Sequence, residues 1–236
     1  MYTEERLRNI TDSDIQQAFK KIQGDTLAEG RLELITEDCF PKVLETLKEC
    51  FIDNEPLEKS LQMQWSSDME DVWLNALKYN LSLMLVDKES EEIIGVRVIR
   101  VTRKSDYFEK NKYKDERVIK LLNFFDFTTD KCDFFSKFGV TEIFEFFGLG
   151  VVRKYRRRGF GKLLMETGVK FLDSLGIKPC YIRGSASSNF SKTIFEKCGF
   201  ESVAEFSYED YKVNGSVIFD NTGEHKSMTV YAKSLV

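Results

Sequence analysis

A basic turn with two glycines, lying between an apolar stretch and an amphipathic one, constrains the fold of this chain most. Residues 144–152 are mainly apolar and predict a strand, while apolar residues recur at helical spacing over 162–175. Between them, Arg156 opens a run of three arginines that is followed by Gly159, Gly161 and Lys162. The sequence therefore predicts a strand, a basic turn and a helix in direct succession.

This turn has the properties of an anion site. Glycine lets a backbone N–H approach a ligand without interference from a Cβ. The first N–H groups of the helix that follows have no intrahelical partner, and the positive end of the helix dipole lies there. Phosphate is the anion that fits such a turn best, and the arginines add charge and fork-shaped donors.

Spacing excludes two common phosphate loops. Gly159 to Lys162 is too short for G-x-x-x-x-G-K-[ST] and lacks its hydroxyl, and no third glycine completes G-x-G-x-x-G. The remaining pattern, Arg156-x-x-Gly159-x-Gly161, resembles the acetyl-coenzyme A pyrophosphate loop of GNAT-type N-acetyltransferases. The alternative is a solvated basic turn with a helix-capping glycine. The resemblance implies a set of cofactor-binding residues: Leu149, Gly150, Val151, Arg156, Arg157, Arg158, Gly159, Phe160, Gly161 and Lys162.

The order of the predicted elements leads to the same family. The pattern alone indicates an α/β or α+β protein; it resembles the GNAT fold, a mixed, mostly antiparallel sheet with helices on both faces. We expect residues 1–30 to form an N-terminal extension and 31–236 one domain with an insertion at about 102–140. Strands are predicted at 31–35, 81–86, 93–101, 144–152, 179–184, 200–207 and 228–232, and helices at 40–51, from Pro56, at 67–79, within the insertion, at 162–175 and at 188–197.

Two further segments resemble the insect arylalkylamine N-acetyltransferases. In Asn54-Glu55-Pro56, Glu55 matches the family's general base, and in the segment from Ser187 to Phe200 two family serines match Ser187 and Ser191. Four residues apart, these serines are expected on one face of a shared helix. The structural alternatives are a surface carboxylate before a helix-starting proline, and a simple N-cap at Ser187 or the next serine.

The segments also depart from the family pattern. Asn189 stands where the family usually has histidine, and Arg153 replaces a frequent proline. Phe195 occupies the position at which many GNAT enzymes have a tyrosine that protonates the departing thiolate. Ser187, Ser191 or water would then do that work, or coenzyme A leaves as a thiolate.

Composition narrows the class of protein. Hydrophobic residues make up 42% of the 236, which is enough for a substantial core. Five cysteines without C-x-x-C indicate reduced thiols, and no cluster has metal-ligand spacing. The lone His225 lies in a polar loop and is set aside. No run of 18 apolar residues and no signal-like segment occurs, so we expect a cytoplasmic protein without membrane contact.

The predicted reaction is acetyl transfer from acetyl-CoA to small primary amines, with arylalkylamines implied by the resemblance. An alkylammonium has a pKa of about 10.4, so a carboxylate such as Glu55 is needed to accept its proton. The insertion, rich in phenylalanine, is expected to shape the acceptor site.

Two alternative functions remain open: a GNAT enzyme for another amine (polyamine, histamine, peptide or lysine), and a non-catalytic CoA binder. Nucleic-acid binding or nuclear import through residues 154–158 is a rival that the net charge of −4 disfavours.

Overall fold

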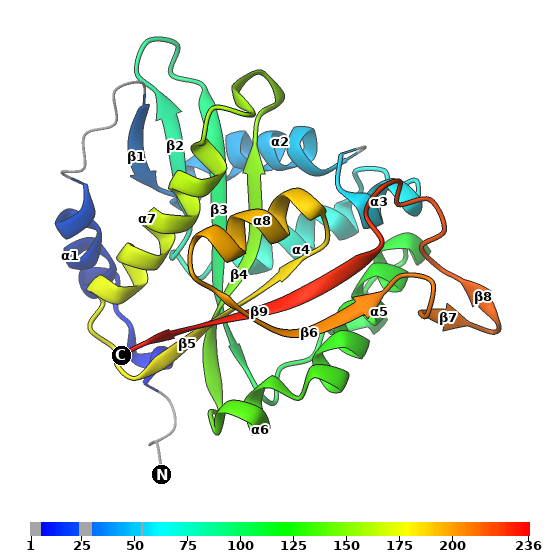
Figure 1. Cartoon of the computed structure of the whole chain (residues 1–236). Helices are drawn as coiled ribbons and strands as arrows, with labels where there is room; N and C mark the ends of the chain where they lie inside the picture. The colour runs from blue at the N-terminus through cyan, green and yellow to red at the C-terminus, as the bar shows by residue number, and fades with distance from the viewer. Residues whose placement is uncertain (1–5, 24–29, 53) are drawn as a thin grey trace.

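The computed structural model describes residues 6–23, 30–52 and 54–236. Its centre is a seven-stranded sheet of order β1-β2-β3-β4-β5-β9-β6 (Figure 1), in which only the β4–β5 pair is parallel. The mixed, mostly antiparallel sheet predicted from the sequence is therefore confirmed. Its strands are β1 (Gly30–Leu34), β2 (Leu83–Asp87), β3 (Ile93–Arg103), β4 (Glu142–Val151), β5 (Cys180–Ala186), β6 (Glu201–Ser207) and β9 (Ser227–Leu235).

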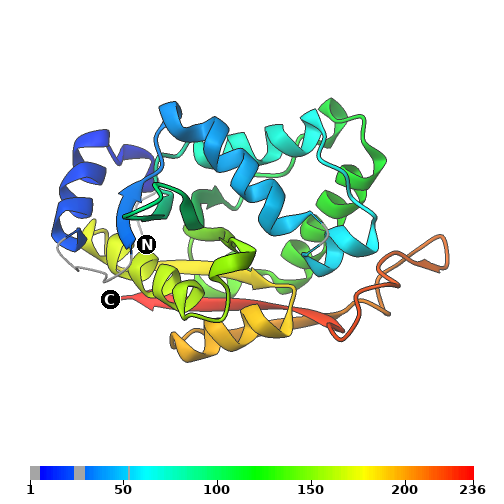
Figure 2. The same ribbon diagram turned by 90° about the horizontal axis from the view of Figure 1, so that it is seen from above.

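Helices cover both faces of the sheet, as Figure 2 shows from above. On one face α2, α4 and α5 enclose the larger core, and on the other α7 and α8, with α1 against α7, enclose the second. The longer helices α1, α2, α4, α5 and α7 each bury one apolar stripe at helical spacing. The helices are α1 (Asp12–Ile22), α2 (Phe40–Phe51), α3 (Pro56–Ser60), α4 (Ser67–Leu77), α5 (Glu116–Cys132), α6 (Phe134–Phe138), α7 (Phe160–Ser174) and α8 (Asn189–Lys197).

Helix α1 lies within the stretch expected to be an extension. Its Ile15, Phe19 and Ile22 are buried in the core beside α7. The Lys21 Nζ also donates a hydrogen bond to the carbonyl of Ser174 at the end of α7, at 3.0 Å. The described part of this N-terminal region is thus packed onto the helix that follows the basic turn.

The sheet opens between β4 and β5. These strands pair only from Phe144–Phe146 to Ile182–Gly184, and beyond that point they diverge (Figure 1). Strand β4 also has a bulge at Phe147, because Val98 pairs with Gly148 while the next β3 residue pairs with Phe146. A gap therefore forms at the ends of the strands from which α7 and α8 begin.

The bounds of several elements differ from the sequence prediction. Helix α7 begins at Phe160, two residues before the predicted start. A short hairpin of β7 (Lys212–Val213) and β8 (Ser216–Val217) surrounds Asn214-Gly215, in a stretch for which no strand was predicted. Both turn residues have positive φ, which is the conformation that an Asn-Gly hairpin turn requires. In the described ranges, no helix is long and apolar enough to cross a membrane.

Candidate active site

One cavity of about 1490 Å³ occupies the opening between β4 and β5 and extends across the face covered by α2, α4 and α5. Its walls include Glu55, Ser187 and Ser191 together with the glycines of the basic turn. The residues predicted from three distant segments therefore line a single cavity. Arg158 is the one predicted site residue that does not line it, and its guanidinium lies over the rings of Tyr155 and Phe160.

The backbone of the turn is shaped to leave space at Gly159. Its φ is +85°, and Arg157 also has a positive φ of 63°. A Cβ built on Gly159 would meet no atom within 4 Å. The N–H of Leu163 donates to the Gly159 carbonyl at 3.0 Å, which is the first i→i−4 hydrogen bond of α7. The N–H groups of the three residues before it therefore have no partner within the helix. Donors at the positive helix end thus adjoin open space.

Arg156 turns its side chain back toward the end of α2. Its Nε donates to the Val151 carbonyl at 2.9 Å, and its Nη1 donates to the side-chain oxygen of Asn54 at 3.0 Å. The Nη2 lies 3.4 Å from the Cys50 carbonyl. This arginine therefore connects the basic turn to the segment that carries Glu55.

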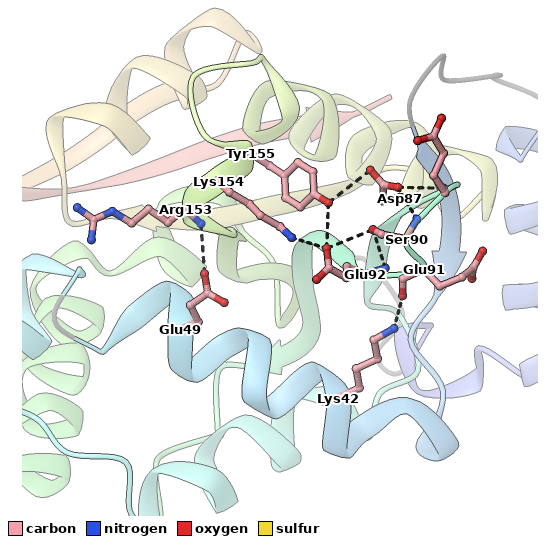
Figure 3. Close-up of polar contacts among 10 residues, drawn as sticks. Lys42, Glu49, Asp87, Ser90, Glu91, Glu92, Arg153, Lys154 and Tyr155 are labelled. Carbon is pink, nitrogen blue, oxygen red and sulfur yellow. Dashed lines mark hydrogen bonds and ion pairs between the residues drawn. The ribbon is translucent and has the colours of Figure 1, made fainter.

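The outer part of the turn is fixed to the β2–β3 hairpin and α2 (Figure 3). Lys154 forms an ion pair with Glu92, whose carboxylate also accepts from the Tyr155 hydroxyl at 3.4 Å. The backbone N–H of Arg153 donates to Glu49 on α2, at 3.4 Å. Because Lys154 is already paired with a carboxylate, the stretch at 154–158 offers less free charge to a nucleic acid than its sequence indicates.

Gly150 is required by packing. A Cβ there would lie 2.9 Å from the Cβ of Cys50, so glycine lets α2 approach β4 closely. The resemblance implied a cofactor-binding position at Gly150, and the structure adds this packing reason for the glycine. Gly161 likewise lets α7 approach α8, since its Cβ would lie 3.1 Å from Ile194.

Glu55 is the N-cap of α3, where Pro56 begins the helix. Its Oε2 accepts the N–H of Glu58 at 2.7 Å, and the Ser187 hydroxyl is a second hydrogen-bond partner. Burial raises the pKa of Glu55, and these hydrogen bonds act in the opposite direction. A half-buried carboxyl with a raised pKa on a cavity wall is suited to accept a proton from a bound amine.

Ser187 reaches Glu55 because it lies outside the helix. The N-cap of α8 is Ser188, so the expectation that Ser187 and Ser191 share a helix is wrong. The Ser187 carbonyl accepts the hydroxyl of Tyr208 at 2.7 Å, and this tyrosine is only 1% exposed. Tyr208 therefore fixes the backbone of Ser187. Its position depends on a contact 21 residues away, and nothing local in the sequence indicates it.

Ser191 has a structural function at the start of α8. Its N–H donates to the Ser188 hydroxyl at 3.1 Å, and its own hydroxyl donates to the Ser188 carbonyl at 2.9 Å. The two serines form a capping box. The alternative of an N-cap at Ser187 or Ser188 is therefore confirmed for Ser188.

His225, which the sequence interpretation set aside, lies on the cavity wall beside the start of α8. Its Nδ1 accepts the backbone N–H of Asn189 at 3.1 Å, and burial lowers its pKa. The imidazole is therefore a neutral acceptor in this arrangement. Across residues 6–23, 30–52 and 54–236, no group of three or more His, Cys, Asp or Glu side chains is arranged to hold a metal ion.

Aromatic rings form another part of the cavity wall. Trp73 of α4 lies between Phe51, at 4.8 Å between ring centroids, and Phe147 of the β4 bulge, at 5.2 Å. The predicted insertion contributes Phe108 and Phe125 to the same cavity. This side of the cavity therefore fits an apolar, flat group.

Buried charged side chains lie on β4 and on the neighbouring strands β3 and β5, on both faces of the sheet. Glu145 accepts from Arg100 at 2.6 Å and from Arg183 at 2.5 Å. Burial alone would raise the pKa of Glu145, but the two arginines hold it well below its usual range. On the α7 face, Arg97 is 1% exposed, and its Nε donates to the carbonyl of Gly148 in the bulge at 3.0 Å. The sequence analysis identified none of these four residues, because only strand register brings them together.

Comparison with known proteins identifies relatives along most of the chain. The model of the acetyltransferase (GNAT) family matches residues 40–200. The crystal structure of arylalkylamine N-acetyltransferase 2 from Aedes aegypti is 26% identical, with a TM-score of 0.79, covering 88% of this chain and 99% of that one. Mosquito arylalkylamine N-acetyltransferase like 5b is 20% identical, with a TM-score of 0.80 and coverage of 87% and 100%.

A Drosophila melanogaster polyamine N-acetyltransferase, an enzyme that catalyses the formation of N-acetylagmatine, has the same fold. It is 16% identical, with a TM-score of 0.78, and the match covers 88% of this chain and 100% of that one. The fold is therefore common to proteins named for aromatic amines and for polyamines.

Proposed function

Because the chain belongs to the acetyltransferase (GNAT) family, we propose that it acetylates small primary amines, with arylalkylamines as the acceptor class. The observation that carries this proposal is the position of Glu55. Its carboxyl lies on the wall of the same cavity that the basic turn and the ring of Trp73 line. Donor site, base and acceptor wall are thus continuous.

The residues present fit acetyl-coenzyme A, the acetyl donor of this family. The open space over Gly159 and the N–H groups at the start of α7 suit its pyrophosphate. The cofactor would supply the acetyl group as an activated thioester. We assign the β4 backbone at Leu149, Gly150 and Val151 to the polarisation of the thioester carbonyl, since this stretch lies beyond the last pairing with β5.

Glu55 then prepares the acceptor. The carboxylate attracts the ammonium group of the amine and accepts its proton, directly or through water. The Ser187 hydroxyl stabilises the ionised form of Glu55 and sets its orientation. Ser191 is proposed to contribute through α8, whose capping box it completes next to the cavity.

The aromatic wall supports arylalkylamines over polyamines. A flat ring buried between Trp73 and the insertion gains apolar contact, which an extended polyamine would not. The amine end would then lie toward Glu55. A peptide amine would need an open groove, whereas this cavity is bounded by the 102–132 part of the insertion.

A thiol-release assay with acetyl-coenzyme A and a panel of amines tests the proposal. We expect release with tyramine, dopamine, serotonin, octopamine or 2-phenylethylamine, and slower release with agmatine, spermidine and histamine. Thiol release that requires agmatine or spermidine would replace the proposed acceptor class. Cofactor binding in calorimetry without release for any amine would identify a non-catalytic CoA binder.

Arg156→Ala should weaken acetyl-coenzyme A binding by about 1–3 kcal/mol, because a charged donor near the pyrophosphate site is lost and the Asn54 contact breaks with it. Titration calorimetry of each variant measures this change. The control is Lys154→Ala, since Lys154 is paired with Glu92 and half-exposed, and its loss should leave the affinity nearly unchanged. An Arg156→Ala effect confined to the KM of the amine would show that the assignment is wrong.

A further inference from the structure

Glu58 is a buried carboxyl whose environment the proposed reaction does not yet explain. It is only 4% exposed, and its Oε2 has no hydrogen-bond partner among the described residues. Glutamate at the third position of a helix commonly closes a capping box by accepting the N-cap N–H. Here the N–H of Glu55 donates to the Phe51 carbonyl at 2.8 Å, so the carboxyl of Glu58 is left out of the cap.

The position of Glu58 connects it to the acceptor site. It lines the same cavity as Glu55 and Ser187, and α3 places it one turn from Glu55. Within the part of the chain that the structure describes, neither carboxyl forms an ion pair with a lysine or arginine. The titratable groups on the surrounding elements are exposed Lys59 of α3, His225 of the C-terminal loop and the Tyr208 phenol, which donates to the Ser187 carbonyl.

The carboxyl of Glu58 is buried and that of Glu55 beside it is half-buried, and without a cation the two do not both ionise. Burial raises the pKa of Glu58 well above its usual range, and the charge of Glu55 raises it further. Desolvation and like-charge repulsion therefore leave one proton on the pair when the site is empty. An uncompensated buried carboxyl costs stability, and such groups persist where a ligand compensates them.

We propose that Glu55 and Glu58 together form a two-carboxyl receptor for the ammonium group of the acceptor, which holds one proton when empty and releases it when the amine binds. This inference rests on the proposed function. Before binding, Glu58 is a neutral carboxyl, Glu55 is a carboxylate and the ammonium is free. After binding, the ammonium lies between two carboxylates, and the proton of Glu58 has passed to solvent. Glu55 subsequently accepts a proton from the amine itself.

Calorimetry of 2-phenylethylamine binding to the protein saturated with coenzyme A tests the receptor without turnover. Titrations at pH 7 in buffers of different ionisation enthalpy count the protons released. We expect a release approaching about one proton per amine in the wild type and almost none in Glu58→Gln. 2-Phenylethanol, which is neutral, should release none, and the control Glu45→Gln, on the exposed face of α2, should match the wild type.

Two outcomes would overturn the proposal: amine binding by the wild type without proton release, or the same release from Glu58→Gln. Thiol release with acetyl-coenzyme A separates this result from the proposed function. An active enzyme that releases no proton on binding retains the function without the receptor. Proton-linked amine binding without acetyl transfer would retain the receptor and reject the function.

Thermal unfolding provides a second measurement that does not depend on ligand. The pKa of Glu58 is raised on folding, so the folded state binds more protons, and its stability falls as pH rises above the unfolded value of about 4.5. Glu58→Gln has no proton to lose at this position, so this fall in stability with rising pH is absent from the variant. The Tm of the variant relative to the wild type should therefore increase steadily from pH 5 to pH 8, while a constant or decreasing difference would contradict the buried, protonated state.

Discussion

Glu55→Gln should lower kcat by roughly 10²–10⁴-fold while affinity for acetyl-coenzyme A stays nearly unchanged. Glutamine keeps the shape of the side chain, and its oxygen can still accept the Glu58 N–H that starts α3. It cannot accept a proton from the amine. Steady-state kinetics at pH 7 and calorimetric titration of the cofactor measure the two quantities separately, with exposed Glu45→Gln as the control.

The pH dependence gives this substitution a second, independent signature. Because burial raises the pKa of Glu55, the acid limb of the wild-type rate profile should lie above the range of an ordinary carboxylate. Below that limb Glu55 is protonated and cannot act as a base. The variant should lose or shift the limb and recover partly at high pH, where more amine is neutral. Near-normal kcat at pH 7 would show that Glu55 only caps α3.

Gly159→Val should lower acetyl-coenzyme A affinity by about two orders of magnitude or more. A residue with φ of +85° that carries a branched side chain is strained by about 1–3 kcal/mol, so the turn would rearrange. The new side chain would also occupy the open space where the phosphate is expected. The fold should persist, because no neighbouring atom lies within 4 Å of the added Cβ.

Gly139→Val is a matched control for this change. Gly139 also has a positive φ, at 65°, and open surroundings, but it ends α6 and does not line the cavity. Both variants should lose similar stability in thermal unfolding, and only Gly159→Val should lose cofactor affinity in calorimetry. Equal affinities in the two folded variants would remove the main argument for a phosphate site at this turn.

Local sequence was sufficient for the elements that carry strong periodicity. The apolar repeat from Phe40 to Phe51 predicted α2, and Pro56 marked the start of α3. The order of strands was not accessible, because β9 enters between β5 and β6 through pairings that join residues far apart in the chain. Hydrophobic alternation indicates which face of a strand is buried, but it does not indicate with which other strand it pairs.

The candidate site divides in the same way. The resemblance to the insect arylalkylamine N-acetyltransferases linked Glu55 and Ser187 with the basic turn, and the structure brings all three to one cavity. Ser187 and Ser191 were given a shared helix, whereas the cap at Ser188 separates their surroundings. Glu58 could have been noticed as a glutamate three residues after an N-cap. Its burial depends on segments of the protein that are distant in the sequence, and the local sequence does not indicate them.

The short pairing of β4 with β5 also affects how the protein responds to its ligand. Past Phe146 and Gly184, the backbones of these two strands do not pair with each other, which leaves an unpaired edge within the sheet. A ligand held there acts as a structural component of the sheet, and at 100 times its Kd it would stabilise the native state by about 2.7 kcal/mol. Where backbone amide exchange requires release of the ligand, its rate would fall in proportion to the unoccupied fraction of the site. The thermal tolerance of this protein would therefore follow the supply of the cofactor that we propose to bind between these strands.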